Sequence, residues 1–547
     1  MAEAKRTGFL NSTVVGVTVL SVAMLASLVQ VFRGGRELSG ADGKTVLRIC
    51  HWQLEDGFRA ALQGTIDDYE RLHPDVRIVQ MPITEKVYGQ WLNTQLISGT
   101  APDLIESGKS KYASDDESMV RYFLALGGAI SKPNPYNAGT NLEGLPWRET
   151  MRDGMKIGYR AKLLDYYAVP VTLVGTRVFV NRTLLKEVTG SDEPPTTFGQ
   201  LMAIGRATEA YAARTGLPVR AVASAYALDY FADRYRVAFT ASLEPALDRN
   251  LDGAVTSLET YEGVLNGSVS FDTPQVRAFY ETMEALAGLL GTGYAAIDRQ
   301  QAQFNFSQSR AIFLGTGSWD AEGIRNAMDK KGWDLGVIDF PLPAPGEPWG
   351  EHVTGRAADA GVGWGVPFAV FKGSPNQDRA LDFLRFLSSQ RANEKFNKAA
   401  NWPPVTIGAE PSDLMRPFVP DPIGYTSRAD LKIGSQVSNV LSGQETLFFS
   451  GETSYDAMVA TVDAAIRNPL YGGDRAWSLE YDAAVRETRN QERMLTMQAT
   501  RALLDPTAAG DAAEKFRKGL LQQVRKNNGA DLAKRYEDLR GHPIPAI

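Results

Sequence analysis

Hydrophobic and polar positions follow two periods along the chain, one typical of strands and the other typical of helices. The segment 45–52, TVLRICHW, alternates apolar and polar residues and is rich in β-branched side chains, so it predicts a strand. Residues 54–74 then show helical spacing up to a proline, and 76–83, VRIVQMPI, predicts a second strand. A helix and another strand follow within 88–108. Strands that alternate with helices predict βαβ units and an open, mostly parallel sheet.

This alternation continues far along the chain. Residues 166–185 are strand-rich with an internal proline, which predicts a crossover between two units. Residues 310–319 predict a strand that runs into a glycine-rich turn, and 362–371 predict another strand. A long amphipathic helix is expected over 376–396. Beyond Tyr471 the sequence becomes charged and helical, which indicates a C-terminal extension.

Composition excludes several classes of protein. The chain has 547 residues, 44% of them hydrophobic and 22% charged, as expected for a folded globular protein. Its formal net charge of -6 gives no positive field to attract nucleic acid. The single cysteine, Cys50, forms no intrachain disulfide, and four histidines in so long a chain argue against a histidine-based zinc or iron site.

The N-terminus carries an apolar run. Lys5 and Arg6 precede an uncharged stretch at 14–32, close to the roughly 20 residues that cross a bilayer as a helix. The exit, LVQVFRGG, offers no good cleavage site, so we expect an uncleaved signal anchor, with secretion after cleavage as the alternative. The rest of the protein would then lie on the periplasmic side, anchored to the cytoplasmic membrane.

Three tryptophans, Trp52, Trp319 and Trp364, stand where a predicted strand gives way to a turn. In open α/β sheets, ligands bind beyond the carboxyl ends of strands. An indole offers a flat apolar face to a sugar ring, and neighbouring carboxylates and amides can bind its hydroxyl groups. The residues near such turns that complete the candidate site are Glu55, Glu106, Asp320, Asn401 and Trp402. A lone tryptophan more often packs in a core, so the shared context carries the prediction.

From about Val46 to Pro404 the chain resembles the extracellular solute-binding proteins of carbohydrate ABC importers, which are maltose-binding-protein-like. The resemblance rests on the order of several segments: SGTAPDLIES, AVPVTLVGTRVFVNRTLL before PPTTFGQLM, VSFDTPQVRAFYE, FNFSQSRAIFLGTGSWD and SPNQDRALDFLRFLSSQ. It implies a two-lobed type II periplasmic-binding-protein fold that closes by a hinge around a carbohydrate or polyol. The implied partner is the permease of an ABC transporter.

The resemblance also implies roles for particular residues. Trp52, Glu106, Trp319 and Trp364 fall where the family places residues of the ligand cleft. Tyr226 and Asp229 are expected to reach the cleft from the second lobe. The domain division that follows is a cytoplasmic stub at 1–13, a signal anchor at 14–32, a linker at 33–44, lobe 1 at 45–168, lobe 2 at 173–310, a return to lobe 1 at 311–370, lobe 2 helices at 371–470, and a charged helical extension at 471–547.

A calcium loop is a further expectation. The stretch LDRNLDGAVTSLE matches the EF-hand pattern over 248–259. Calcium takes six to eight hard oxygens, and a glycine at the sixth position, here Gly253, permits the sharp turn that lets them converge. The expected ligands are the side chains of Asp248, Asn250, Asp252, Thr256 and Glu259 and the carbonyl of Ala254. The alternative is an Asx-rich turn with an accidental ligand set. A bound ion here is expected to be structural, because the loop is far in sequence from the tryptophan turns.

Three functions stay open at this point. The first is a tethered solute-binding protein with no enzymatic activity. The second is a carbohydrate hydrolase with paired carboxylates about 5–10 Å apart. The third is a tethered sensor or scaffold that acts through its C-terminal helices. The sequence shows no Ser-His-Asp, Cys-His or phosphate-loop signature.

Overall fold

The computed structural model describes residues 43–489 except 55–56, 109–114, 161–162, 164, 224, 249–254, 291–296, 360–364, 422, 426–427, 430, 432, 473–474, 476, 484 and 487–488. The expected cytoplasmic stub, signal anchor and most of the linker therefore lie outside the described residues, as does the chain beyond 489. In the part that the structure does describe, no helix combines the length and the apolar character that crossing a bilayer requires.

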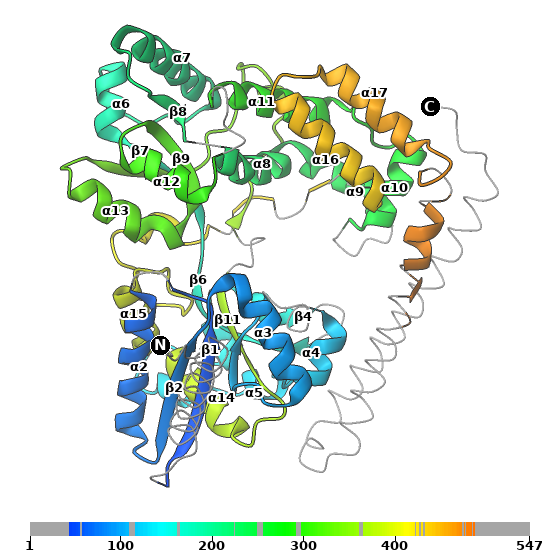
Figure 1. Ribbon diagram of the computed structural model, residues 1–547. Coiled ribbons are helices and arrows are strands. Elements are labelled where there is room, and N and C mark those ends of the chain that lie inside the picture. The colour runs from blue at the N-terminus through cyan, green and yellow to red at the C-terminus, as the bar shows by residue number, and fades with distance from the viewer. Residues whose placement is uncertain are drawn as a thin grey trace, which may run out of the picture.

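Two α/β lobes make up the molecule (Figure 1). The sheet of lobe 1 has the strand order β2-β1-β3-β11-β6, and the sheet of lobe 2 has the order β10-β7-β9-β8. The strands of lobe 1 are β1 (Thr45–His51), β2 (Val76–Pro82), β3 (Leu104–Glu106), β6 (Val169–Leu173) and β11 (Gly365–Val370), beside a small hairpin of β4 (Tyr159–Arg160) and β5 (Asp165–Tyr166). Those of lobe 2 are β7 (Thr176–Asn181), β8 (Arg220–Val222), β9 (Ala311–Gly317) and β10 (Leu335–Ile338).

Helices cover both sheets, as the alternating sequence predicts. In lobe 1 they are α2 (Phe58–Leu72), α3 (Glu85–Ser98), α4 (Asp116–Tyr122), α5 (Gly127–Ile130), α14 (Gln377–Leu387) and α15 (Gln390–Ala400). In lobe 2 they are α6 (Arg182–Thr189), α7 (Phe198–Thr215), α8 (Ala225–Thr240), α9 (Glu244–Leu247), α10 (Ser257–Leu265), α11 (Pro274–Gly288), α12 (Arg299–Ser307), α13 (Ala321–Asp329), α16 (Ser435–Phe449) and α17 (Tyr455–Ile466). Successive β1 side chains point to opposite faces, so Leu47 and Ile49 enter one apolar cluster and Cys50 the other.

Each sheet is mostly parallel, with one antiparallel strand. In lobe 1 that strand is β11, which runs against β3 and β6. In lobe 2 it is β7, which runs against β9 and β10. Both are the first strands that the chain adds after it crosses from the other lobe. This exchange of strands between two lobes is the type II topology that the resemblance implies.

The course of the chain between lobes differs from the sequence-based division. Residues 311–370 were expected to return to lobe 1, but β9 pairs with β7 and β8, and the return begins only at β11. Residues 371–470 were expected to supply lobe 2 helices, but α14 and α15 pack in the lobe 1 core, whereas α16 and α17 pack in that of lobe 2. Hydrophobic periodicity identifies an apolar face, but it does not specify which of two similar sheets that face covers.

In the described part of the chain, three segments lead from one lobe to the other: from β6 to β7, from β10 to β11, and from α15 to α16. A buried ion-pair cluster ties their lobe 2 ends together. The Asp359 carboxylate accepts hydrogen bonds from the guanidinium groups of Arg177 and Arg234, each at 2.7 Å. It also accepts the backbone N–H of Asp421 at 3.0 Å. Burial pushes the pKa of Asp359 upward, but the hydrogen bond and charge of Arg177 and the charge of Arg234 outweigh it and hold the pKa below its usual value. The cluster therefore joins the start of β7 to the segment between β10 and β11 and to the segment between α15 and α16.

Candidate functional site

The directions of the strands decide which residues face the opposite lobe. The chain leaves lobe 1 at the carboxyl end of β6 and enters β7, so that end of the sheet points toward lobe 2. β1 and β3 run parallel with β6, so Trp52 and Glu106 lie at the same edge. In lobe 2, the last residue of β9 pairs with the first residue of β7, which places Trp319 next to the crossover. The turns after β1, β3 and β9 thus lie at the edges of the two sheets that face the other lobe.

On the lobe 1 side, Glu106 holds the turn that carries Trp52. Its buried carboxylate accepts the backbone N–H of Trp52 at 2.9 Å and a hydrogen bond from the side-chain amide of Gln53. The hydroxyl of Tyr88 donates to the backbone carbonyl of Glu106 at 2.7 Å, and the ring of Tyr88 lies edge-on to Trp52 with centroids 4.9 Å apart. The hydrogen bonds of Glu106 show that it positions Trp52, and its predicted contact with the ligand stays a prediction. Gln53 and Tyr88 were not predicted.

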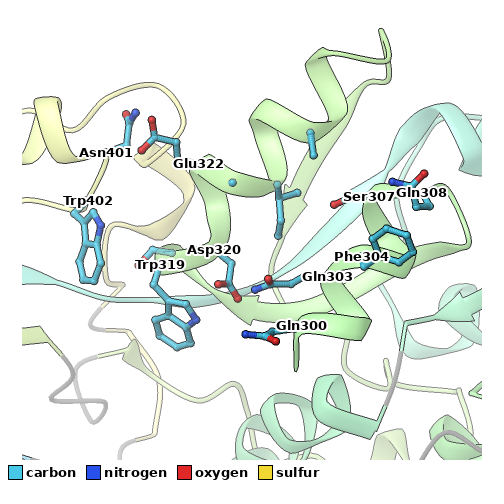
Figure 2. Close-up of a pocket in the computed structure, with 14 residues that line it drawn as sticks. Gln300, Gln303, Phe304, Ser307, Gln308, Trp319, Asp320, Glu322, Asn401 and Trp402 are labelled. Atoms are coloured by element: carbon cyan, nitrogen blue, oxygen red, sulfur yellow. The ribbon is translucent and has the colours of Figure 1, made fainter. Parts of the chain in front are cut away.

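A pocket of about 430 Å³ opens between the lobes, and we call it the interlobe pocket (Figure 2). Lobe 1 contributes Asn401 and Trp402, which follow α15. Lobe 2 contributes Trp319 and Asp320 together with residues of α12 and α13. Four of the predicted site residues are therefore brought together here. Trp52 and Glu106 are not among the described residues that line this pocket.

Trp319 connects the two lobes at this pocket. It belongs to lobe 2 in sequence, but its indole packs against the core cluster of lobe 1. Its ring centroid lies 6.1 Å from that of Tyr230 on α8, a residue that the sequence analysis did not select. A Cβ at Gly317 would lie only 2.2 Å from the ring, so the absence of a side chain there makes room for the indole. The buried Nε1–H has no acceptor among the described residues, so it is available as a donor to a bound ligand.

Asp320 is engaged by neighbours within its own lobe. Arg299 forms an ion pair with the carboxylate, and the hydroxyl of Thr316 donates to Oδ2 at 2.6 Å. The guanidinium carbon of Arg299 lies 5.9 Å from the centre of the Trp319 ring, within reach of a cation–π interaction. Asp320 therefore positions Arg299 beside the indole. Arg299 gave no sequence signal, because its contact comes from packing of α12 against β9, and Thr316 was not selected either.

Glu322, on the first turn of α13, reaches across to lobe 1. Its Oε2 lies 3.1 Å from the point that a Cβ would occupy at Gly57, the residue that precedes α2. A carboxylate at the N-terminal end of a helix is favourable, because the helix dipole places partial positive charge there. Figure 2 shows Glu322 beside Asn401, which ends α15 in the left-handed conformation with φ of 51°. No sequence pattern singled out Glu322.

The remaining predicted cleft residues have different outcomes. Asp229 lies on α8 and stays accessible to solvent, although the protein around it removes enough water to raise the pKa of its carboxyl. Tyr226 is on the same helix, but its side chain lies outside the described part of the structure. Glu55 and Trp364 also lie outside the described residues, so their predicted roles stay predictions.

The predicted calcium loop is described only at its two ends. Asp248 is buried where α9 ends. Thr256 and Glu259 form a capping box at the start of α10, in which Glu259 Oε2 accepts the backbone N–H and the hydroxyl of Thr256, each at 2.9 Å. Asn250, Asp252 and Ala254 lie outside the described residues. No cluster of three or more acidic, histidine or cysteine side chains arranged for a metal occurs in the described part, so calcium binding stays a prediction.

The chain matches the family model of the "Bacterial extracellular solute-binding protein" over residues 52–394, which is more than half of its length. It therefore belongs to the bacterial extracellular solute-binding protein family. This confirms the resemblance that the ordered sequence segments indicated. The family description also agrees with the expected location outside the cytoplasm. No curated protein matches the chain.

Solved structures share the fold. One is the GacH receptor of Streptomyces glaucescens, with a TM-score of 0.53, 17% identity, and coverage of 78% of this chain and 98% of that chain. Another is the solute-binding protein RafE in complex with raffinose, with a TM-score of 0.50, 13% identity, and coverage of 77% and 98%. At these identities the likeness establishes the two-lobed fold. About a fifth of this chain lies beyond the shared part.

Proposed function

We propose that this protein captures a carbohydrate or polyol outside the cytoplasm, in the interlobe pocket, and delivers it to the permease of an ABC transporter. The observation that carries the proposal is the lining of the pocket from both lobes. Trp319 comes from lobe 2, Asn401 and the largely buried Trp402 come from lobe 1, and glutamines of α12 add further amide groups. Such a pocket offers apolar faces to a sugar ring and hydrogen bonds to its hydroxyl groups.

The solved relatives support a carbohydrate as the ligand class. The GacH receptor has been solved with acarbose, and RafE with raffinose. Both are oligosaccharide-like molecules of a size that a two-lobed protein can enclose. Because 98% of each relative is covered, this chain shares nearly the whole of their fold. Which carbohydrate fits this pocket depends on its own lining residues.

Two carboxylates of the predicted site, Asp320 in the pocket and Glu106 outside its lining, support binding over hydrolysis. A hydrolase of the paired-carboxylate type keeps one carboxylic acid protonated near neutral pH so that it can donate a proton. Asp320 is instead held in an ion pair by Arg299 and accepts a hydrogen bond from Thr316. Glu106 accepts hydrogen bonds from the turn that it positions. We therefore expect a bound sugar to be released unchanged.

The tether and the C-terminal extension belong to the same proposal. The uncharged run at 14–32 would anchor the protein to the cytoplasmic membrane, close to its permease. Trp477, at the start of the extension, packs in the lobe 2 core, which supports an extension fixed to that lobe. A sensor or scaffold role for the helices further along the chain stays an alternative prediction.

Thermal unfolding of the full-length protein against a panel of mono- and oligosaccharides and polyols tests the proposal. A ligand at about 100 times its dissociation constant adds roughly 2.7 kcal/mol of stability, so the melting temperature should rise by a few degrees. Chromatography of the recovered sugar should show no conversion. A panel that produces no shift, or a sugar that is consumed, would refute the proposal.

A further inference from the structure

The charged side chains that line the interlobe pocket are of one sign. Among the described residues, Asp320 and Glu322 are acidic, and no lysine or arginine belongs to the lining. The other polar lining residues are hydroxyls and the amides of Gln300, Gln303 and Asn401, together with Gln308. An amide can donate to one sugar hydroxyl and accept from another, so these side chains suit uncharged polar groups.

Among the described residues, three cations contact the lining from outside it. Lys331 donates a hydrogen bond to the side-chain oxygen of Gln308 at 2.7 Å and Arg310 stands over the ring of Phe304, both at the end of the pocket away from Glu322 (Figure 2). The third cation, beside Asp320, is already paired. Arg299 forms an ion pair with Asp320 and stands above Trp319, so its charge is balanced within the wall of the pocket. An anionic ligand that recruited Arg299 would have to approach the Asp320 carboxylate as well. Repulsion between like charges strengthens in a water-poor cavity, because the effective dielectric constant falls well below that of water.

The helix dipoles beside the pocket also disfavour a negatively charged ligand. α15 ends at Ala400, directly before Asn401 and Trp402, so its partially negative end faces the pocket. The positive N-terminal end of α13 carries Glu322 in its first turn, with Asp320 just before it. The same Glu322 carboxylate lies at the start of α2. Carboxylates thus offset the partial positive charge at the N-terminal ends of α13 and α2. The partial negative charge at the C-terminal end of α15 makes the potential in the pocket more negative still.

We propose that the interlobe pocket selects glycans without negative charge, either neutral or amino sugars, and rejects uronic, sulfated and phosphorylated glycans. This inference rests on the proposed function, because it concerns the same pocket. An amino sugar would place its ammonium group near Glu322 and the end of α15. A uronate would place its carboxylate near two carboxylates without an unpaired cation in the described lining.

Calorimetric titration of the full-length protein at neutral pH tests the proposal. The neutral probes are maltotriose, raffinose, xylotriose and triacetylchitotriose, the amino probe is chitosan trisaccharide, and the acidic probes are trigalacturonate and trimannuronate. The best neutral or amino probe should bind at least about tenfold more tightly than either acidic probe. An acidic probe that binds as tightly or more tightly overturns the charge rule but leaves glycan binding intact. If none of the probes binds, both the proposed function and the charge rule are refuted.

The variant Glu322→Gln assigns the selectivity to the pocket. It keeps the shape of the side chain and removes its charge, so the ratio of acidic-probe to neutral-probe dissociation constants should fall at least about threefold. For an amino ligand, the affinity should fall by a similar factor while that for neutral probes is retained. Glu452→Gln is the matched control, because Glu452 is exposed between α16 and α17. Equal ratios in the wild type and both variants would contradict the proposal.

Discussion

Gly317→Ala is expected to displace Trp319 and to weaken ligand binding. A Cβ at residue 317 would stand 2.2 Å from Cζ3, 2.3 Å from Cη2 and 2.5 Å from Cε3 of the Trp319 ring. Ordinary van der Waals contact begins near 3.4 Å, so the indole must move by about 1 Å or more. The ring would then leave the position from which it lines the pocket and packs against lobe 1.

The size of the effect follows from the loss of one aromatic platform. Aromatic stacking contributes about 0.5–1.5 kcal/mol beyond the area that it buries, and 1.4 kcal/mol is a factor of ten in affinity. With the area term included, we expect the dissociation constant of the best sugar to rise about tenfold. Overpacking of this kind costs about 1–3 kcal/mol, so the free energy of unfolding should also decrease.

Two further variants separate the effect on binding from the effect on folding. Gly443→Ala adds a methyl group within α16 where nothing lies within 4 Å, so it should keep the affinity and add about 0.5–1 kcal/mol of stability. The double variant Gly317→Ala with Trp319→Ala should recover stability relative to Gly317→Ala but not affinity, because the clash is gone and so is the ring. Wild-type affinity in Gly317→Ala, measured by calorimetry, would refute the role given to Trp319.

The remaining predictions concern stability. Asp359→Asn leaves Arg177 and Arg234 buried without their carboxylate, so chemical denaturation should show that the free energy of unfolding falls by about 3–5 kcal/mol. A decrease of less than about 1 kcal/mol would contradict the role of the buried ion-pair cluster. Burial lowers the pKa of His51 from 6.5 to about 4, so the unfolded chain binds a proton first as the pH falls through this range. Stability should therefore drop by up to about 3 kcal/mol between pH 6.5 and pH 4, and His51→Gln, compared by denaturation at both ends of that range, should remove this component. Calcium should raise the melting temperature of the wild type and not that of Asp252→Asn; an equal rise in both, or none, would favour the Asx-rich turn.

Local features of the sequence predict much of this fold, because strand alternation and helix spacing depend on near neighbours. The turns after β1, β3 and β9 could be located, and with them Trp52, Trp319 and Asp320. Assignment of β9 to a lobe could not be predicted, because its buried side chains would suit either sheet.

The finer features of the site depend on contacts between distant segments. Glu322 lies against Gly57 only because α13 and α2 meet between the lobes, and no local pattern marks that meeting. Glu106 was predicted from its position at a strand end, but its role as a positioning residue follows from the hydrogen bond to Trp52. Strand ends therefore indicate where a ligand binds, whereas the partners of each side chain decide what it does there.

The most direct test of a carbohydrate held between the lobes is a calorimetric titration of the full-length protein and of Trp319→Ala with the sugar that gives the largest thermal shift. We expect one binding site per chain, recovery of the sugar unchanged, and an affinity at least about tenfold lower in the variant. Equal affinities in the two proteins would place the sugar elsewhere, and conversion of the sugar would show that the protein is an enzyme.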